Sequence, residues 1–106
     1  MNNKITYTNG KTSYDLELFH TTYANNGNLA VIAFIEGTKE PAGTVTVNIS
    51  DMSPTLACID INNMPGIFEV LIEDGLAEDT GYTIESGYCT YPIARFDLAK
   101  IPVYKE

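Results

Sequence analysis

The sequence predicts an α+β domain in which a mainly antiparallel sheet of about six strands carries one short helix on one face. Runs of alternating apolar and polar residues recur along the chain and are separated by turn residues, whereas residues 67–75 carry apolar residues at helical spacing. At 106 residues the chain fits one domain, residues 1–106, with a core of its own. Within it we expect an N-terminal hairpin at 1–22, a strand–strand–helix core at 44–75 and a loosely held tail at 99–106.

The first element expected is a β-hairpin around the dipeptide Asn9-Gly10, with alternating residues on both sides. Asn-Gly favours a two-residue type I′ turn, in which both central residues need a positive φ. A loop at these two residues places Tyr7 opposite Thr12, and Lys4 opposite Asp15 as a cross-strand charge pair.

The strands that follow are marked by branched and apolar residues. We expect the second strand to continue to about Tyr23, and Leu29 to Ile35 to form a strand buried on both faces because the run has no polar residue. An exposed loop at 37–43 then precedes a half-buried strand at 44–50, and a further strand covers 56–62.

One helix is expected between Asn63 and Gly75. Asn63 is a suitable N-cap, and Pro65 in the first turn leaves no backbone N–H unsatisfied. Gly75 is typical of the left-handed residue that follows a helix, and Leu76 is placed for the apolar contact that accompanies it. A helix this short is stable only when it packs on the sheet.

The last apolar run contains two interruptions. Ser86-Gly87 divides it into two strands or puts a bulge into one. Tyr91-Pro92 then places a proline inside a strand pattern, and proline cannot donate to the hydrogen-bond ladder. We therefore expect Tyr91-Pro92 to lie on an edge strand or a bent one.

Charge is distributed unevenly along this chain, whose net charge is −8. Between Lys39 and Arg95 there is no basic residue, while nine acidic residues lie in that interval. Direct binding of nucleic acid needs clustered lysine and arginine, so this pattern argues against it and fits a basic protein partner. An acidic composition also serves solubility alone, and both interpretations stay open.

Several functional classes find no support in the sequence. No apolar run approaches the roughly 18 residues of a membrane helix, and no signal peptide begins the chain, so we expect a cytoplasmic protein. Cys58 and Cys89 lie in apolar strand-like runs and are expected to be free, buried thiols. His20 and the cysteines lack metal-ligand spacing, and no nucleophile motif is present. We therefore expect no enzyme, no cofactor, no metal, and a monomer or weak dimer.

The remaining functional candidate in the sequence is a protein-binding surface. Carboxylates gather at the end of the helix and in the segment after it, and tyrosines follow, which could equally lie at the edge of the core. Carboxylates can pair with arginines, and tyrosines bury rigid aromatic area, which are common ingredients of interfaces. A solvated helix face would look the same. The predicted partner-binding residues are Glu69, Glu73, Asp74, Glu78, Asp79, Tyr82 and Tyr88.

Short motifs between Leu29 and Leu98 follow one another in a particular order: Leu29-Ala30-Val31, Thr46-Val47-Asn48-Ile49, Asp60-Ile61-Asn62-Asn63, Thr80-Gly81, Ser86-Gly87-Tyr88 and Tyr91-Pro92-Ile93. Their order and spacing resemble a family of short uncharacterised proteins, a domain of unknown function found in conjugative elements and phages of Gram-positive bacteria. The resemblance implies no catalytic residue. Its polar and glycine positions are of types that also serve turns, caps and buried hydrogen bonds, and we expect most of them to be structural.

The resemblance implies a mobile-element context, in which small acidic proteins often inhibit host defence. The leading hypothesis is therefore an inhibitor of CRISPR effector nucleases or restriction enzymes whose carboxylates occupy a basic nucleic-acid-binding surface of the enzyme. The alternative is an accessory or regulatory subunit of the element that binds a protein through the Tyr91-Pro92 edge strand. A third hypothesis is a small metal-binding protein that uses His20 and the cysteines.

Overall fold

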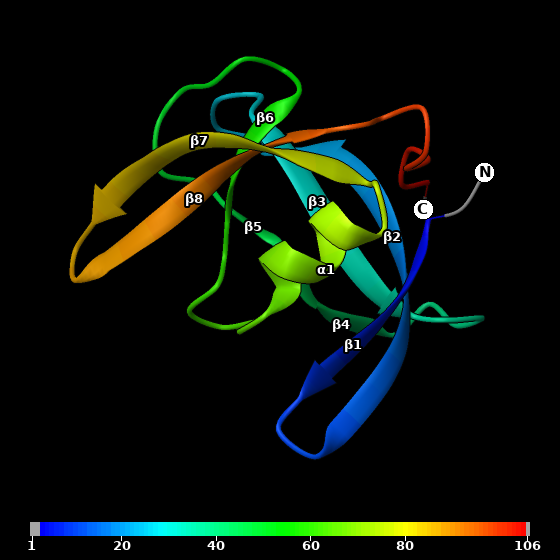
Figure 1. Ribbon diagram of the computed structural model, residues 1–106. Helices are drawn as coiled ribbons and strands as arrows, with labels where there is room; N and C mark the ends of the chain where they lie inside the picture. The colour runs from blue at the N-terminus through cyan, green and yellow to red at the C-terminus, as the bar shows by residue number, and fades with distance from the viewer. Residues whose placement is uncertain (1–2, 106) are drawn as a thin grey trace.

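The computed structural model describes residues 3–105 and shows an α+β fold, as predicted, with eight strands in that part of the chain rather than about six (Figure 1). The strands form two antiparallel four-stranded sheets, ordered β1-β2-β3-β4 and β5-β6-β8-β7. The elements are β1 (Lys4–Asn9), β2 (Thr12–Thr22), β3 (Leu29–Ile35), β4 (Pro41–Thr44), β5 (Thr46–Val47), β6 (Leu56–Ile59), α1 (Ile67–Glu73), β7 (Ala77–Ser86) and β8 (Cys89–Phe96).

The two sheets are joined at Val45, which is fully buried. Its N–H donates to the Val31 carbonyl (2.8 Å) in the first sheet, and its carbonyl accepts from the Asp60 N–H (2.8 Å) beside the second. The predicted loop at 37–43 and strand at 44–50 are thus misplaced. Pairing begins at Pro41 and ends at Val47, because the chain changes partner at Val45 instead of leaving the sheet.

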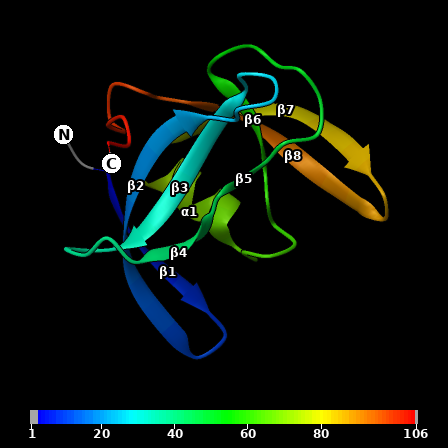
Figure 2. The same cartoon turned by 180° about the vertical axis from the view of Figure 1, so that it is seen from behind.

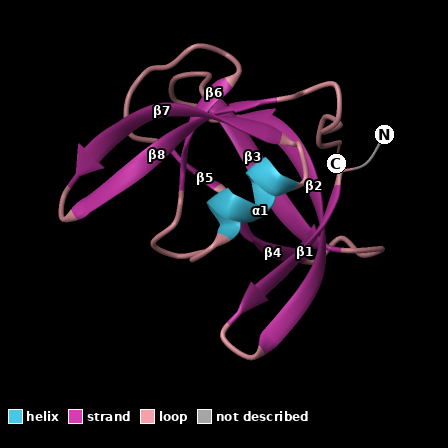
Figure 3. Ribbon diagram, viewed as in Figure 1, coloured by secondary structure: helices cyan, strands magenta, loops and turns pink. Residues whose placement is uncertain are grey.

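The helix closes the open side of this arrangement. It contacts β1 and β7, which are edge strands of the two sheets, and Figure 3 shows it between the sheets. Ile67 and Leu71 are completely buried in the same core as Leu18 of β2 and Ile59 of β6. The helix therefore fills the gap between the edge strands of the two sheets, and its apolar face packs against the shared core.

The end of the helix follows the prediction, but its start does not. Gly75 has φ 73°, its N–H donates to Ile72, and the N–H of buried Leu76 donates to Leu71, which together form a Schellman motif. The N-cap is Gly66 (φ 83°), not Asn63.

Asn63 belongs to the turn before the helix. Its backbone N–H and its side-chain amide both donate to the Asp60 carboxylate, at 3.1 and 2.8 Å. The Asp60–Asn63 turn is closed by these bonds, so Asn63 is not available to cap the helix that begins after Gly66.

The N-terminal hairpin forms with a different register from the one predicted. Tyr7 lies opposite Tyr14 and Lys4 opposite Glu17, so the two-residue loop is Gly10-Lys11. Only Gly10 has a positive φ (66°), which fits a type II′ turn with glycine at its first central position. Because the shift is by two residues, Ile5 and Tyr7 still face the core.

The strand that contains Tyr91-Pro92 lies inside its sheet from Ile93 onwards, but at Pro92 it has a neighbour on one side only, so the edge position predicted for Pro92 holds locally. β8 lies between β6 and β7, and Tyr91 is almost fully buried. β6 pairs with β8 only from Ile93 onwards, so Pro92 has a partner strand on one side alone. Proline is tolerated there because the side without a paired neighbour requires no N–H.

The C-terminal tail, expected to be loosely held, is bonded to β2 in its described part. The His20 N–H donates to the Pro102 carbonyl (2.9 Å), and the Tyr104 N–H donates to the His20 carbonyl (2.8 Å). Ile101 is completely buried. The tail crosses from β8 to the β2 side of the molecule (Figure 2), where Tyr104 stacks on Phe34 of β3. β3 has buried residues on both of its faces, as predicted.

Candidate partner-binding surface

The predicted acidic residues lie on two neighbouring elements. Glu69 and Glu73 are exposed on α1, and Asp74 is its C-cap. Glu78 and Asp79 are exposed at the start of β7, directly after the turn at Gly75. The sequence thus placed these carboxylates correctly at the surface. No basic residue lies in the last turn of the helix, so the negative end of its dipole adds to the carboxylates there.

The acidic residues on β7 lie among basic side chains. Glu78 pairs across the strands with Arg95, and both line an open hollow of ≈ 630 Å³ together with Asp79 and Lys100. Lys100 Nζ donates to the Gly75 carbonyl (2.9 Å). This part of the surface is therefore mixed in charge, because Arg95 and Lys100 fold back onto it from beyond the acidic segment.

A second hollow, of ≈ 360 Å³, has a larger excess of acidic over basic residues than the first and lies between the helix end and the N-terminal hairpin. We call it the acidic groove, and its charged residues are Lys4, Asp15, Glu36, Glu73 and Asp74. Lys4 Nζ lies 2.9 Å from the Glu36 carboxylate, and this hydrogen bond and the charge of Glu36 raise the pKa of Lys4. The acidic groove thus contains four carboxylates and one ammonium group.

Sequence reasoning missed Asp15 and Glu36 as members of this surface. They lie at least 31 residues before the helix in the chain, and no local pattern in the sequence indicates that α1 packs against β1. Tyr7 fixes that arrangement, since its hydroxyl donates to the Pro65 carbonyl (2.9 Å) just before the helix. Burial also raises the pKa of the Tyr7 phenol.

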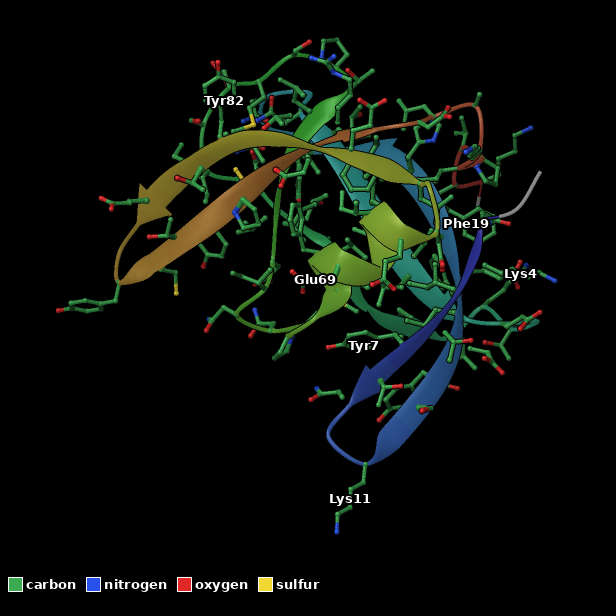
Figure 4. All side chains as sticks on the ribbon, in the orientation of Figure 1. Lys4, Tyr7, Lys11, Phe19, Glu69 and Tyr82 are labelled. Atoms are coloured by element: carbon green, nitrogen blue, oxygen red, sulfur yellow. The ribbon has the colours of Figure 1, made fainter. Side chains whose placement is uncertain are left out.

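The two predicted tyrosines lie apart from the acidic groove. Tyr82 is 73% exposed and belongs to a β-bulge held by bonds from the Gly81 N–H to Asp79 (2.8 Å) and from the Tyr82 N–H to Thr80 (3.1 Å). Figure 4 shows Tyr82 beside β7 and Glu69 on the helix. The predicted partner-binding residues therefore do not form one continuous surface, because Tyr82 lies apart from the acidic groove.

Tyr88 is fully exposed at the tip of the β7–β8 hairpin. The tip lies about 25 Å from Glu78 at the usual rise per strand residue. Tyr88 and the carboxylates at the start of β7 cannot therefore form one compact contact, although they can meet separate parts of a large partner.

The candidate metal ligands are not brought together. His20 lies on β2 in the first sheet, where its Nδ1 is 2.7 Å from the Ile101 carbonyl, whereas Cys58 and Cys89 lie in the second sheet. Within residues 3–105 no group of three or more histidine, cysteine or carboxylate side chains is placed to hold a metal ion.

Both cysteines are free, as predicted. Cys58 is buried against Met52, with 4.0 Å between the sulfurs, and burial raises the pKa of its thiol. Cys89 is half-buried, and a hydrogen bond with it, together with burial, raises the pKa of Tyr91.

Most of the polar motif residues have structural roles. The Asn48 amide accepts from Asn26 (3.1 Å) and Asn28 (3.0 Å) and donates to Asn25 (3.1 Å), which ties the β2–β3 turn to the loop after β5. Asp60 and Asn63 close the turn described above. Gly81 and Gly87 have φ values of 80° and 61°, which glycine adopts without strain.

Comparison with known protein families gives one match. A family described as "Domain of unknown function (DUF4313)" matches residues 16–106. The chain belongs to this family. The match extends beyond the resemblance seen at 29–98, and it begins inside β2. Lys4 and Asp15 of this DUF4313 protein therefore lie outside the matched region, while Glu36, Glu73 and Asp74 lie within it.

No curated protein and no solved structure matches the chain. Among the helices of residues 3–105, none has the length and apolar character needed to cross a bilayer.

Proposed function

We propose that this DUF4313 protein is a non-enzymatic binding protein whose acidic groove engages a basic surface of a protein partner. The observation that carries the proposal is the convergence of Asp15, Glu36, Glu73 and Asp74 at the C-terminal end of α1. That end of a helix favours cations, so carboxylates there gain nothing for the fold. An arginine or lysine of a partner would pair with the carboxylates and would also be attracted by the negative end of the helix dipole.

The proposed partner class is supported by the charge of the groove and by the mobile-element context that the family resemblance implies. We propose that the basic surface is a nucleic-acid-binding channel of a host defence nuclease, a CRISPR effector or a restriction enzyme, and that the protein acts for a mobile element. Such channels present arrays of arginine and lysine that neutralise phosphates, and the carboxylates of the groove would bind these arrays in place of the phosphates. On this proposal the protein acts in the cytoplasm, where those nucleases work, and as a monomer without a cofactor or direct contact with nucleic acid.

The test is capture of partners from a Gram-positive host lysate at low salt by the tagged protein, with identification by mass spectrometry. Beside the parent we would use Glu73→Lys/Asp74→Lys and a matched variant, Asp51→Lys/Glu85→Lys, which changes net charge equally at exposed positions outside the groove. A nucleic-acid enzyme captured by the parent and the matched variant, but lost by the groove variant, supports the proposal. Equal capture by all three contradicts it.

The groove variant also carries its own folding control. Lysines at the helix end would complement the dipole, so we expect its melting temperature to equal or exceed that of the parent by up to about 5 °C. Loss of capture by a protein that melts no lower than the parent cannot be attributed to unfolding.

A second candidate function uses the edge strand, which is β7 rather than the Tyr91-Pro92 strand. β7 spans ten residues and pairs with β8 on one side only. Such an edge can accept a strand from a partner, as an accessory or regulatory subunit of the mobile element would require. Tyr82→Ala/Tyr88→Ala should then abolish capture, while Glu73→Lys/Asp74→Lys preserves it. The reverse pattern favours the acidic groove.

A further inference from the structure

An aromatic hollow lies on the outer face of the first sheet, away from the acidic groove. Phe19 of β2 and Phe34 of β3 pack edge to face with ring centroids 5.7 Å apart, and Tyr104 of the tail stacks on Phe34 at 5.3 Å. The hollow has a volume of ≈ 160 Å³, and its lining residues are Phe19, Phe34, Thr38, Lys39, Tyr104 and Lys105. We call it the aromatic groove.

The size of the aromatic groove suits one side chain. An apolar protein cavity of about 150 Å³ accommodates a benzene ring. The aromatic groove is open to solvent at Lys39 and Lys105, which are both exposed, and its floor is the nearly buried ring of Phe34. It can therefore receive a phenylalanine, leucine or similar side chain from outside, without rearrangement of the main core.

Two of the six basic residues of this acidic chain lie at the aromatic groove. Lys4 is paired with Glu36, and Lys100 lies 3.9 Å from Asp97. Neither Lys39 nor Lys105 makes an ion pair with any of residues 3–105. Lys39 and Lys105, neither of them ion-paired within residues 3–105, thus flank an aromatic pocket on a protein whose net charge is −8. An apolar side chain with carboxylates beside it complements both features.

The tail pre-forms the site. Tyr104 and Lys105 reach it because residues 101–104 are bonded to His20 through its backbone and its Nδ1. Buried Ile101 anchors the same segment in the core. One wall of the groove is therefore ordered before any ligand arrives, which lowers the entropic cost of binding.

We propose that the aromatic groove binds a segment of a partner protein in which an apolar side chain is flanked by carboxylates. This site is separate from the acidic groove and takes ligands of opposite charge. It therefore stands or falls independently of the function proposed above.

The probe is the blocked tripeptide glutamate-phenylalanine-glutamate, titrated into the isotope-labelled full chain and followed by NMR. We expect progressive shifts at Phe19, Phe34 and Tyr104, and much smaller shifts with lysine-phenylalanine-lysine or glutamate-alanine-glutamate. Lys39→Glu/Lys105→Glu should weaken binding about fivefold or more, since two exposed ion pairs are replaced by repulsion. Lys11→Glu/Arg95→Glu, which changes net charge equally at exposed sites outside this groove, should bind as the parent does.

Four results would overturn the proposal. Shifts confined to residues outside the aromatic groove would place the peptide elsewhere. Equal binding of the lysine peptide, or equal weakening by the matched variant, would remove the role of Lys39 and Lys105. Shifts at Phe34 and Tyr104 that appear on raising the protein concentration alone would identify a second copy of this chain as the occupant.

Discussion

Replacing Ile101 by alanine tests whether the C-terminal tail is part of the folded domain. The side chain is completely buried in the main core, beside apolar residues of both sheets and the helix. Removing three carbons there forfeits their transfer free energy and leaves a cavity, at a cost of about 2–5 kcal/mol. That is a large share of the roughly 5–15 kcal/mol that stabilises a domain of this size.

The assay is chemical denaturation followed by circular dichroism, with thermal melting beside it. Ile101→Ala should lower the free energy of unfolding by about 3 kcal/mol and the melting temperature by about 12 °C or more. Val103→Ala is the matched control, because its side chain is 53% exposed in the same segment, and it should change stability by less than about 0.5 kcal/mol. An Ile101→Ala variant as stable as the Val103→Ala variant would show that the tail is not docked, and the wall of the aromatic groove would be lost with it.

Further predictions concern the turns and the buried titratable groups. Asn28→Ala should lower the free energy of unfolding by about 2–4 kcal/mol, because the Asn28 amide donates to the Ser50 carbonyl (2.7 Å) and accepts from the Met52 N–H (3.1 Å). Asn62→Ala, at an exposed position, should change the free energy of unfolding by less than about 0.5 kcal/mol. Equal effects of the two substitutions in denaturant melts would contradict the asparagine network. Gly75→Ala should cost about 1–2 kcal/mol by the same assay, since φ is 73° there, and an unchanged midpoint would refute the Schellman end of the helix. Burial raises the pKa of the Cys58 thiol above its ordinary value of 9.0, so the unfolded chain loses this proton at a lower pH than the folded chain. The free energy of unfolding should therefore fall as pH rises above about 9. If the free energy of unfolding of Cys58→Ala falls with pH as steeply as that of the parent, Cys58 is not the cause.

Local patterns sufficed for those parts of the fold that local chemistry determines. Gly75 and Leu76 end the helix as predicted because a Schellman motif needs only a glycine and an apolar residue in sequence. The Leu29–Ile35 run gave a strand buried on both faces because no polar residue interrupts it. The hairpin turn was located, yet its register was wrong by two residues, since alternation is preserved by such a shift and cannot detect it.

Non-local pairing accounts for what the sequence did not reveal. Nothing near Val45 indicates that the chain passes there from one sheet to the other, and nothing near Pro92 indicates that the pairing of β6 with β8 ends just before it. The tail looked loose because proline and charge surround Ile101, whose burial depends on His20, eighty-one residues earlier. The acidic groove was half predicted, since Glu73 and Asp74 are local to the helix, whereas Asp15 of the hairpin and Glu36 after β3 are not.

The salt dependence of partner binding tests the central claim most directly. The affinity of the parent protein for the captured partner would be measured from about 0.1 M to about 1 M salt, over which the screening length falls from about 10 Å to about 3 Å. Binding through the acidic groove predicts a steep loss of affinity for the parent, and a weak, nearly salt-independent affinity for Glu73→Lys/Asp74→Lys. Parent affinity that stays constant across this range would contradict an electrostatic contact and remove the basis for the proposed function.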